Sequence, residues 1–323
     1  MLTVMKAILR LTILIALPAL CVATAGAQAN RTFVSAQKGN DANVSTNCGA
    51  AAPCRTFAAA IGQTNGGGEV AVLDSGGYGP FIIRHSVRVE APAGVYAGIT
   101  VPSGGFGVTI EASILDTVVL KGLTLQSFNG LSGIFVQSVA NLSVEDCIVD
   151  GFLEEGIRMT SLTTCSLMVK DTVVRNGQAD GISVGNNSGL AAAVIDHCKF
   201  FGNPDAGVVA APNAQVTVRD SVASGNGIGF EAFAGETQTL PGNSEMNIEN
   251  CVAIANQDGI LASTGYNNVT ATIRVALTVI SDNTDFGILE SGIVGTPQIL
   301  SFGNNRVSGN ATAGVFTSAI ALQ

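Results

Sequence analysis

The sequence contains no tryptophan, only two histidines and few charged side chains. Of its 323 residues, 12% are charged and 5% are aromatic, and the net charge at pH 7 is −9. Sparse charge with a negative balance suits the phosphates of a nucleic acid poorly, so we expect no nucleic-acid partner. The lack of tryptophan removes one of the aromatic platforms on which sugars stack. The 47% of hydrophobic residues argues against a disordered chain.

The first 29 residues have the pattern of a secretion signal. Lys6 and Arg10 precede an apolar stretch from Leu11 to Leu20, and residues 27–29 (Ala-Gln-Ala) supply small side chains two apart. We predict cleavage before Asn30. After that point no stretch reaches the roughly 18 apolar residues of a membrane helix. We therefore expect a protein without a membrane span that is secreted, periplasmic or at the cell surface.

Two of the cysteines lie close together in a segment with the composition of a loop. Five residues rich in glycine and alanine separate Cys48 from Cys54. In an exported protein this spacing favours a disulfide between the two cysteines. No histidine lies nearby, so we predict no metal site there.

Three markers recur along the chain. The first is a glycine followed by an apolar residue, at Gly133, Gly156, Gly181, Gly207, Gly229, Gly259, Gly287 and Gly314. The second is a short motif, such as Val144-Glu145-Asp146-Cys147, whose last residue is small. These last residues are Cys147, Thr172, Cys198, Ser221, Cys251 and Thr278. The third is an asparagine, at Asn176, Asn203, Asn226, Asn256, Asn283 and Asn310. A regular recurrence of this kind indicates a repeat architecture.

Each repeat holds three short runs in which apolar residues alternate with polar ones, which is the spacing of strands. Glycine, asparagine and aspartate between the runs tolerate tight left-handed turns. Such a unit cannot bury its apolar face alone, but stacked coils can, each bonded to the next at roughly 4.8 Å. The pattern therefore predicts an all-β protein, a single parallel β-helix of about 8–10 coils. The small residues of the second marker should form one inward column.

These repeats resemble the right-handed parallel β-helix superfamily, which is similar in architecture to pectate lyases and polygalacturonases. The resemblance covers about residues 31–320 and includes an N-terminal segment with the run Pro53-Cys54-Arg55-Thr56-Phe57. It implies a right-handed solenoid and an exported bacterial protein. It does not imply one activity, because the same scaffold carries lyases, hydrolases, epimerases and adhesins.

We divide the chain into a signal peptide (1–29), an N-terminal cap (30–69) and the β-helix (70–323). The cap holds one predicted short helix, from Thr56 to Gln63, with Phe57 and Ile61 on one face. It should cover the open strand edges at that end of the solenoid.

Strand alternation places one residue of each repeat on the outer face, just after the glycine marker. This column is Phe135, Arg158, Ser183, Val209, Glu231, Leu261, Leu289 and Phe316. It contains no paired carboxylates, so it does not predict an acid–base site. Its apolar members form a predicted stripe that would bind a glycan or a protein partner: Phe135, Val209, Leu261, Leu289 and Phe316.

The strongest polar cluster lies in the turns before the glycine marker. Glu155 and Asp180 should stack on adjacent coils, with Glu154 and Arg158 close by. Close carboxylates can share a calcium ion or raise one pKa. The alternative is a solvated turn in which Arg158 compensates the charge. We otherwise expect no cofactor.

Two further candidates are assigned to structure rather than chemistry. His197 falls in a turn column with Asp146, Asp171, Asp220 and Asn250, so we predict a turn role. Residues 181–185 match the Gly-x-Ser-x-Gly nucleophile pattern around Ser183, but that motif needs a strand followed by a helix.

The sequence thus predicts an exported, non-catalytic β-helix scaffold of the cell envelope or surface that binds a polysaccharide or an envelope protein. The alternative is a polysaccharide lyase or glycoside hydrolase that uses Glu154, Glu155, Asp180 and Arg158.

Overall fold

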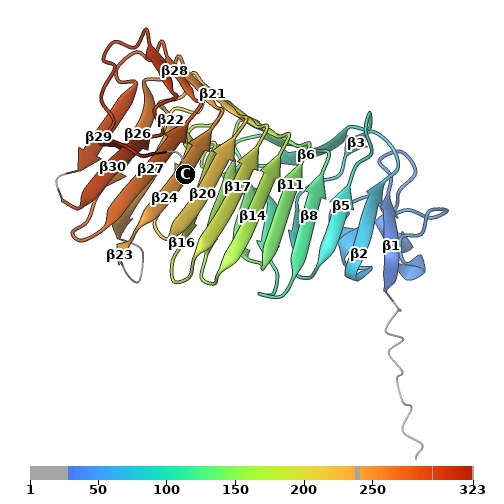
Figure 1. Ribbon diagram of the computed structural model, residues 1–323. Coiled ribbons are helices and arrows are strands. Elements are labelled where there is room, and N and C mark those ends of the chain that lie inside the picture. The colour runs from blue at the N-terminus through green and yellow to red at the C-terminus, as the bar shows by residue number, and fades with distance from the viewer. Residues whose placement is uncertain (1–27, 237–240, 293, 322–323) are drawn as a thin grey trace, which may run out of the picture.

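The computed structural model describes residues 28–236, 241–292 and 294–321. The chain winds into a parallel β-solenoid whose coils stack along one axis (Figure 1). Three sheets run along its length and meet at three corners. The predicted signal peptide lies outside the described residues, apart from Gln28 and Ala29.

Sheet A is a row of twelve strands. It consists of β1 (Ala29–Val34), β2 (Thr64–Val72), β5 (Val87–Glu90), β8 (Thr117–Lys121), β11 (Asn141–Glu145), β14 (Cys165–Lys170), β17 (Ala191–Asp196), β20 (Ala214–Arg219), β24 (Ser244–Glu249), β27 (Thr270–Ala276), β30 (Thr296–Ser301) and β32 (Ser318–Ala319).

Sheet B is a row of ten shorter strands. It consists of β3 (Gly76–Gly77), β6 (Ala97–Val101), β9 (Leu123–Ser127), β12 (Ile148–Asp150), β15 (Val173–Arg175), β18 (Lys199–Phe201), β21 (Val222–Ser224), β25 (Val252–Ile254), β28 (Val279–Ser281) and β31 (Arg306–Ser308).

Sheet C also has ten strands, one of which, β23 (Pro241–Gly242), pairs antiparallel with β22. The others are β4 (Phe81–Ile83), β7 (Phe106–Glu111), β10 (Ser132–Ser138), β13 (Ile157–Ser161), β16 (Ile182–Asn186), β19 (Ala206–Ala210), β22 (Ile228–Glu236), β26 (Asp258–Thr264) and β29 (Ile288–Gly292). The strand counts agree with the predicted number of coils.

The core is a set of inward columns. Ile134 pairs with Ile157, which pairs with Ile182, and this register continues along sheet C. All three are 0% exposed. Because adjacent strands are parallel and in register, each buried side chain packs on its counterpart in the next coil.

The corner between sheets A and B has two residues in every coil from Glu145 to Val279. The first residue is left-handed, with φ between 49° and 53°: Asp146, Asp171, His197, Asp220, Asn250 and Leu277. The second is the predicted inward small residue, and all six are buried. The backbone N–H of Cys198 donates to Ser221 Oγ of the next coil at 3.0 Å, so this column also bonds along the stack.

The glycine marker has a different cause from the one we expected. From Gly133 to Gly287 the marker glycines are absent from the left-handed residues. A Cβ at Gly181 would instead lie 2.5 Å from the carbonyl oxygen of Gly207 in the next coil. Glycine is required there because two coils approach closely, not because the turn is left-handed.

Five of the marker asparagines form a ladder inside the corner between sheets B and C. The side chain of Asn226 donates to Asn256 Oδ1 at 3.0 Å, and the backbone N–H of Asn226 donates to the same oxygen at 3.0 Å. The same pair of bonds links the remaining members: Asn203, Asn226, Asn256, Asn283 and Asn310. Asn176 is not a member, because the N–H that reaches Asn203 belongs to Gly177.

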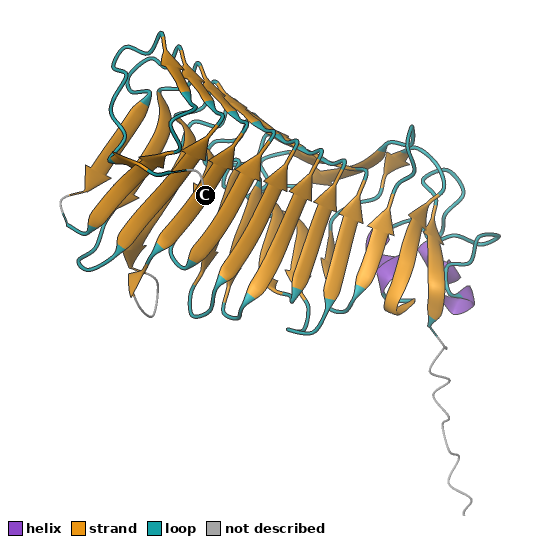
Figure 2. Ribbon diagram, in the orientation of Figure 1, coloured by secondary structure: helices purple, strands orange, loops and turns teal. Residues whose placement is uncertain are grey.

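The N-terminal end is covered as predicted. Helix α1 (Phe57–Ile61) begins after Thr56, whose side chain accepts the N–H of Ala59. The Phe57 ring lies 5.0 Å from that of Tyr78. Helix α1 and the 3-10 helix η1 (Asp41–Thr46) sit together at this end (Figure 2). The cap also supplies a strand, since β1 pairs with β2.

The predicted disulfide between Cys48 and Cys54 is present. The other cysteines that follow the predicted cleavage point are free and buried: Cys147, Cys165, Cys198 and Cys251. Among the described residues, no helix has the length and apolarity needed to cross a membrane.

We expect Asn256→Ala to destabilise the protein by about 2–4 kcal/mol, because it removes the acceptor of two bonds and leaves a buried N–H of Asn226 without a partner. Urea unfolding measures the change. Asn247→Ala is the matched control, since Asn247 is exposed in β24, and it should cost less than about 0.5 kcal/mol. Equal costs for the two variants would contradict the role assigned to the ladder.

Candidate functional site

The outer face of sheet C carries the column predicted from strand alternation. Phe135 pairs with Arg158, Arg158 with Ser183, and Ser183 with Val209. The register continues through Glu231 and Leu261 to Leu289. This part of the prediction is confirmed.

The predicted apolar stripe is not a continuous exposed surface. Val209 is 6% exposed and Leu261 is 8% exposed. Phe316 does not belong to the column, because the next strand, β32, pairs with β30 of sheet A. Phe316 itself lies in no strand, because pairing at this end of sheet C reaches only Thr312, opposite Phe286, before the chain crosses to β32.

The N-terminal part of this face carries a pair of aromatic rings. The rings of Phe106 and Phe135 stack with centroids 4.7 Å apart. The guanidinium of Arg158 lies 5.5 Å from the Phe135 centroid, within cation–π range. Beside the rings is an open depression of about 550 Å³ lined by Ala58, Pro80, Phe81, Ile82, Arg84, Phe106 and Thr109.

The four residues of the predicted polar cluster fall on two coils. Glu154 and Glu155 lie in the turn before β13, and Arg158 is the second residue of that strand. Arg158 Nη1 lies 3.0 Å from Glu154 Oε2 and 3.7 Å from Glu155 Oε2. The cation is therefore shared by two carboxylates, as the compensated-turn alternative expects.

Asp180 lies one coil after Glu155, as predicted, and it also contacts the following coil. Its Oδ1 accepts the N–H of Ala206 in the next coil at 3.0 Å. Burial, followed by the charge of Glu231, raises the pKa of Asp180 to about 7, and Asp205 and Glu155 add to the effect. The Asp180 carboxyl is thus poised to exchange a proton near neutral pH.

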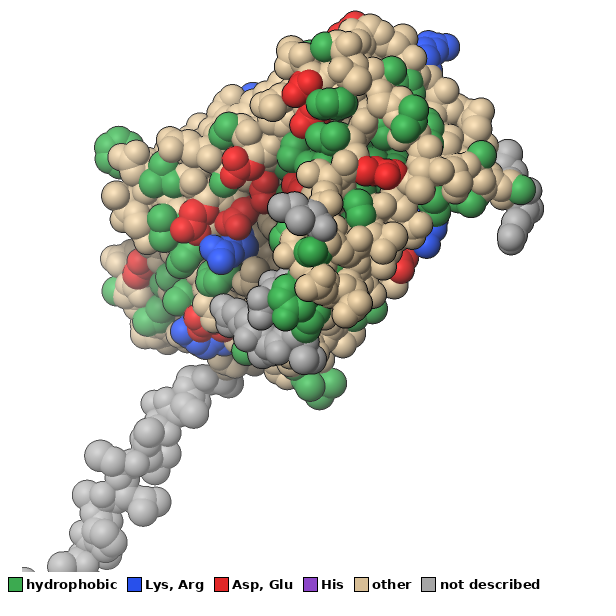
Figure 3. Space-filling model, turned by 90° about the vertical axis from the view of Figure 1, so that its left-hand side faces the viewer, with side chains coloured by type: hydrophobic (Ala, Val, Ile, Leu, Met, Phe, Trp, Pro, Cys, Tyr) green, Lys and Arg blue, Asp and Glu red, His purple; other side chains and the backbone are tan. Residues whose placement is uncertain are grey.

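Glu231 and Asp258 complete a carboxylate cluster on the C-terminal part of the face. Burial raises the pKa of Glu231, whose Oε1 accepts a 2.6 Å bond from Ser263. Burial also raises the pKa of Asp258. With Asp180 and Asp205, these residues line an open depression of about 420 Å³. On the face seen in Figure 3, acidic side chains gather around a hollow, with a basic group beside them.

The outward column carries a single carboxylate, Glu231, as the sequence predicts, but residues outside that column bring further acids to the same depression. Asp180 and Asp205 lie in turns before their strands, Glu231 lies within β22, and Asp258 begins β26. These four acids do not all stand at the same position relative to the glycine marker of their repeats. A comparison of equivalent positions therefore does not assign them to one column. Their shared signal is that consecutive repeats each carry an acid within three residues of the glycine marker.

His197 and Ser183 occupy the positions in the fold that the sequence predicts. His197 has φ 53°, like its turn neighbours, so it is a corner residue of the fold. Ser183 lies within β16, and the chain continues into β17 rather than into a helix. The nucleophile pattern around Ser183 therefore lacks its required context.

Comparisons with known proteins bear on the fold of the chain. A family described as right handed beta helix region matches residues 70–223. Pectate lyase Pel9A has a TM-score of 0.52 and 15% identity, covering 91% of this chain and 79% of that chain. A rhamnogalacturonan lyase has a TM-score of 0.47 and 12% identity, covering 89% of each chain.

The A-module of a mannuronan C-5 epimerase, AlgE6 from Azotobacter vinelandii, has a TM-score of 0.47 and 15% identity, covering 79% of this chain and 90% of that chain. No curated protein sequence matches the chain significantly. At 15% identity the likeness to Pel9A shows the fold alone.

The pKa of Asp180 gives stability a defined pH dependence. Since its value of about 7 exceeds the usual value for aspartate in an unfolded chain, about 4, the folded state holds the proton more tightly. The free energy of unfolding should therefore fall as the pH rises from about 4 to about 7. Asp180→Asn should remove this fall, raising the urea midpoint at pH 8 and changing it little at pH 4.5. Parallel curves for the two proteins would contradict the assignment.

Proposed function

We propose that this protein, a right-handed parallel β-helix with the architecture of the pectate lyases, binds a polysaccharide along the outer face of sheet C. The observation that carries the proposal is the stacked pair Phe106 and Phe135 beside an open depression. Aromatic rings at a surface offer an apolar face to the C–H groups of a sugar. A long, regular strand face suits a long, regular polymer.

Polar groups flank the rings on both sides. Arg84 on the rim of the depression has a side chain that is 63% exposed, and it pairs with Glu111 at 2.8 Å. Arg158 lies over Phe135 and is held by Glu154 and Glu155. Guanidinium and carboxylate groups can donate to and accept from the hydroxyls of a sugar. The face thus combines an apolar platform with hydrogen-bonding groups at its edge.

We also propose that the protein works outside the cytoplasm. The disulfide between Cys48 and Cys54 is of the kind that persists in an oxidising compartment. The leader pattern of residues 1–29 supports the same location. A polysaccharide of the envelope or of the surroundings is then an accessible ligand, and an envelope protein is the other partner we consider.

Phe135→Ala should weaken polysaccharide binding about 3- to 10-fold, the usual contribution of one aromatic contact. Affinity electrophoresis of the purified protein through gels containing polygalacturonate, alginate or a neutral glucan measures this change. Phe128→Ala is the control, because Phe128 is 71% exposed and lies in the turn between β9 and β10, outside the stacked pair of Phe106 and Phe135. Unretarded migration in every gel would contradict the proposal, as would equal effects of the two variants.

A second candidate function is cleavage of the bound polysaccharide. The specific observation in its favour is Asp180, whose raised pKa suits a general acid and whose neighbour Glu231 is a second carboxyl group. Glycoside hydrolysis uses two such carboxyl groups, one as acid and the other as base or nucleophile. Among the four residues predicted from the sequence, Arg158 is bound by two glutamates, so Asp180 is the better candidate.

Release of reducing ends, and absorbance of unsaturated products, would detect hydrolysis and elimination respectively. If the protein is a hydrolase, Asp180→Asn and Glu231→Gln should each lower the rate at least about 100-fold. Asp150→Asn is a control, since Asp150 lies on sheet B and pairs with Arg175. Absence of products from acidic and neutral polymers would contradict cleavage while leaving the binding proposal intact.

A further inference from the structure

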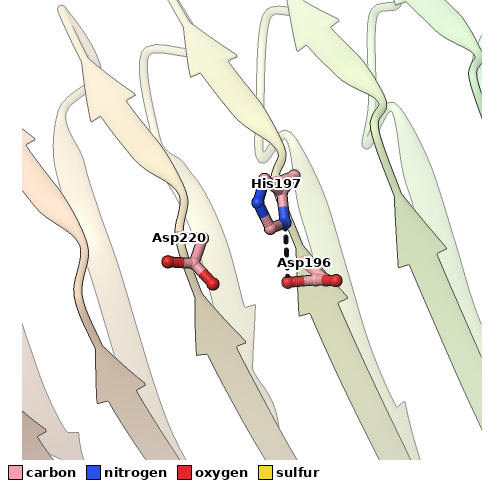
Figure 4. A group of neighbouring side chains, drawn as sticks. All are labelled: Asp196, His197 and Asp220. Atoms are coloured by element: carbon pink, nitrogen blue, oxygen red, sulfur yellow. Dashed lines mark hydrogen bonds and ion pairs between the residues drawn. The ribbon is translucent and has the colours of Figure 1, made fainter.

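A second cluster of ligand-type side chains lies at the corner between sheets A and B, away from sheet C. Asp196 ends β17, His197 is the left-handed corner residue that follows, and Asp220 occupies the equivalent corner position one coil later. One ligand atom from each of the three lies within 4.8 Å of the other two. Figure 4 shows the three side chains on the same edge of two adjacent coils.

The fold brings these atoms together through the register of sheet A. Asp196 pairs with Arg219, so the residues that follow them, His197 and Asp220, are stacked as well. The ring nitrogen Nδ1 of His197 lies 2.9 Å from Asp196 Oδ1. Asp220 is held from the far side by Asn250, whose amide donates to its Oδ1 at 2.5 Å. Each ligand thus starts from a backbone position that the coils fix.

We propose that Asp196, His197 and Asp220 bind a divalent transition-metal ion such as Zn²⁺. One imidazole nitrogen with two carboxylate oxygens is a ligand set that zinc accepts, whereas calcium prefers oxygen ligands alone. Three protein ligands leave water to complete the coordination. This site lies beside an open depression of about 360 Å³ that His197 and Asp220 also line, so an ion reaches it from solvent.

Two neighbours are excluded as ligands by their own contacts. Cys198 follows His197 but is 1% exposed, and its thiol donates to the carbonyl oxygens of Val169 and Asp196. Asp171 lies one coil before His197 and is 3.8 Å from Lys170 Nζ. The metal therefore bridges the coils of β17 and β20 rather than those of β14 and β17.

Arg219 is the competitor for this site. Its Nε donates to Asp196 Oδ1 at 2.9 Å and its Nη2 lies 3.4 Å from Asp196 Oδ2, so the guanidinium now supplies the positive charge beside the buried carboxylate. A bound metal ion would supply the positive charge beside Asp196 in place of the guanidinium. Removing the guanidinium should therefore strengthen metal binding, whereas a purely structural cluster would lose the cation that pairs with Asp196.

Isothermal titration calorimetry of the tag-free, metal-stripped protein with Zn²⁺, and separately with Ca²⁺, tests the proposal. We expect one Zn²⁺ per chain and at least about tenfold weaker Ca²⁺ binding. His197→Ala and Asp220→Asn should each weaken Zn²⁺ binding at least about tenfold. Arg219→Met should strengthen it.

Two matched variants complete the design. His85→Ala removes the only other histidine, and Asp171→Asn removes the carboxylate on the opposite coil, so both should leave Zn²⁺ binding unchanged. Circular dichroism shows whether each variant is folded. The proposal is overturned if Zn²⁺ does not bind, if His197→Ala binds it as tightly as the parent protein, or if Arg219→Met binds it more weakly. None of these outcomes bears on the polysaccharide proposal, which concerns sheet C.

Discussion

Hydrogen bonding between one coil and the next is the interaction on which the rest of this structure depends. Parallel strands in constant register put each residue directly against its counterpart one coil away. A residue type that suits this stacking therefore recurs from coil to coil. A residue that does not suit it destabilises the contacts with both neighbouring coils. The asparagine ladder is the clearest product, since each amide satisfies groups in both neighbouring coils.

The same stacking explains how charges are arranged on the surface. Along the outer edge of sheet A, Lys121 faces Glu145 and Arg219 faces Asp196, so charges of opposite sign alternate. On sheet C the turns bring acids together without a matching set of cations. Asp180 is partly buried there and lies in the field of Glu231, so its proton is retained to unusually high pH. A regular scaffold thus produces one irregular site where like charges meet.

Much of the fold was predictable because it depends on recurrence. The inward column of Cys147, Thr172 and its successors, the disulfide and the capping helix all follow from residue type and spacing. The position of Phe316 was not predictable, because the recurrence stops before the chain does. Asp180 was predicted as a polar candidate, but its grouping with Asp205, Glu231 and Asp258 was not, because these residues occupy unequal positions in their repeats and only the path of the chain brings them together.

The corners of the solenoid differ in how much they vary. Between sheets A and B each coil from Glu145 to Val279 has the same two-residue corner, fixed by a left-handed residue and a buried small one. Between sheets C and A the connection ranges from two residues after β10 to the hairpin that contains β23. The connection from sheet B to sheet C also varies, from three residues after β21 to six after β12, so length varies most widely at the edge between sheets C and A. That edge is also where a foreign peptide could be inserted into the chain, displayed in solvent, without disturbing the packing of the coils.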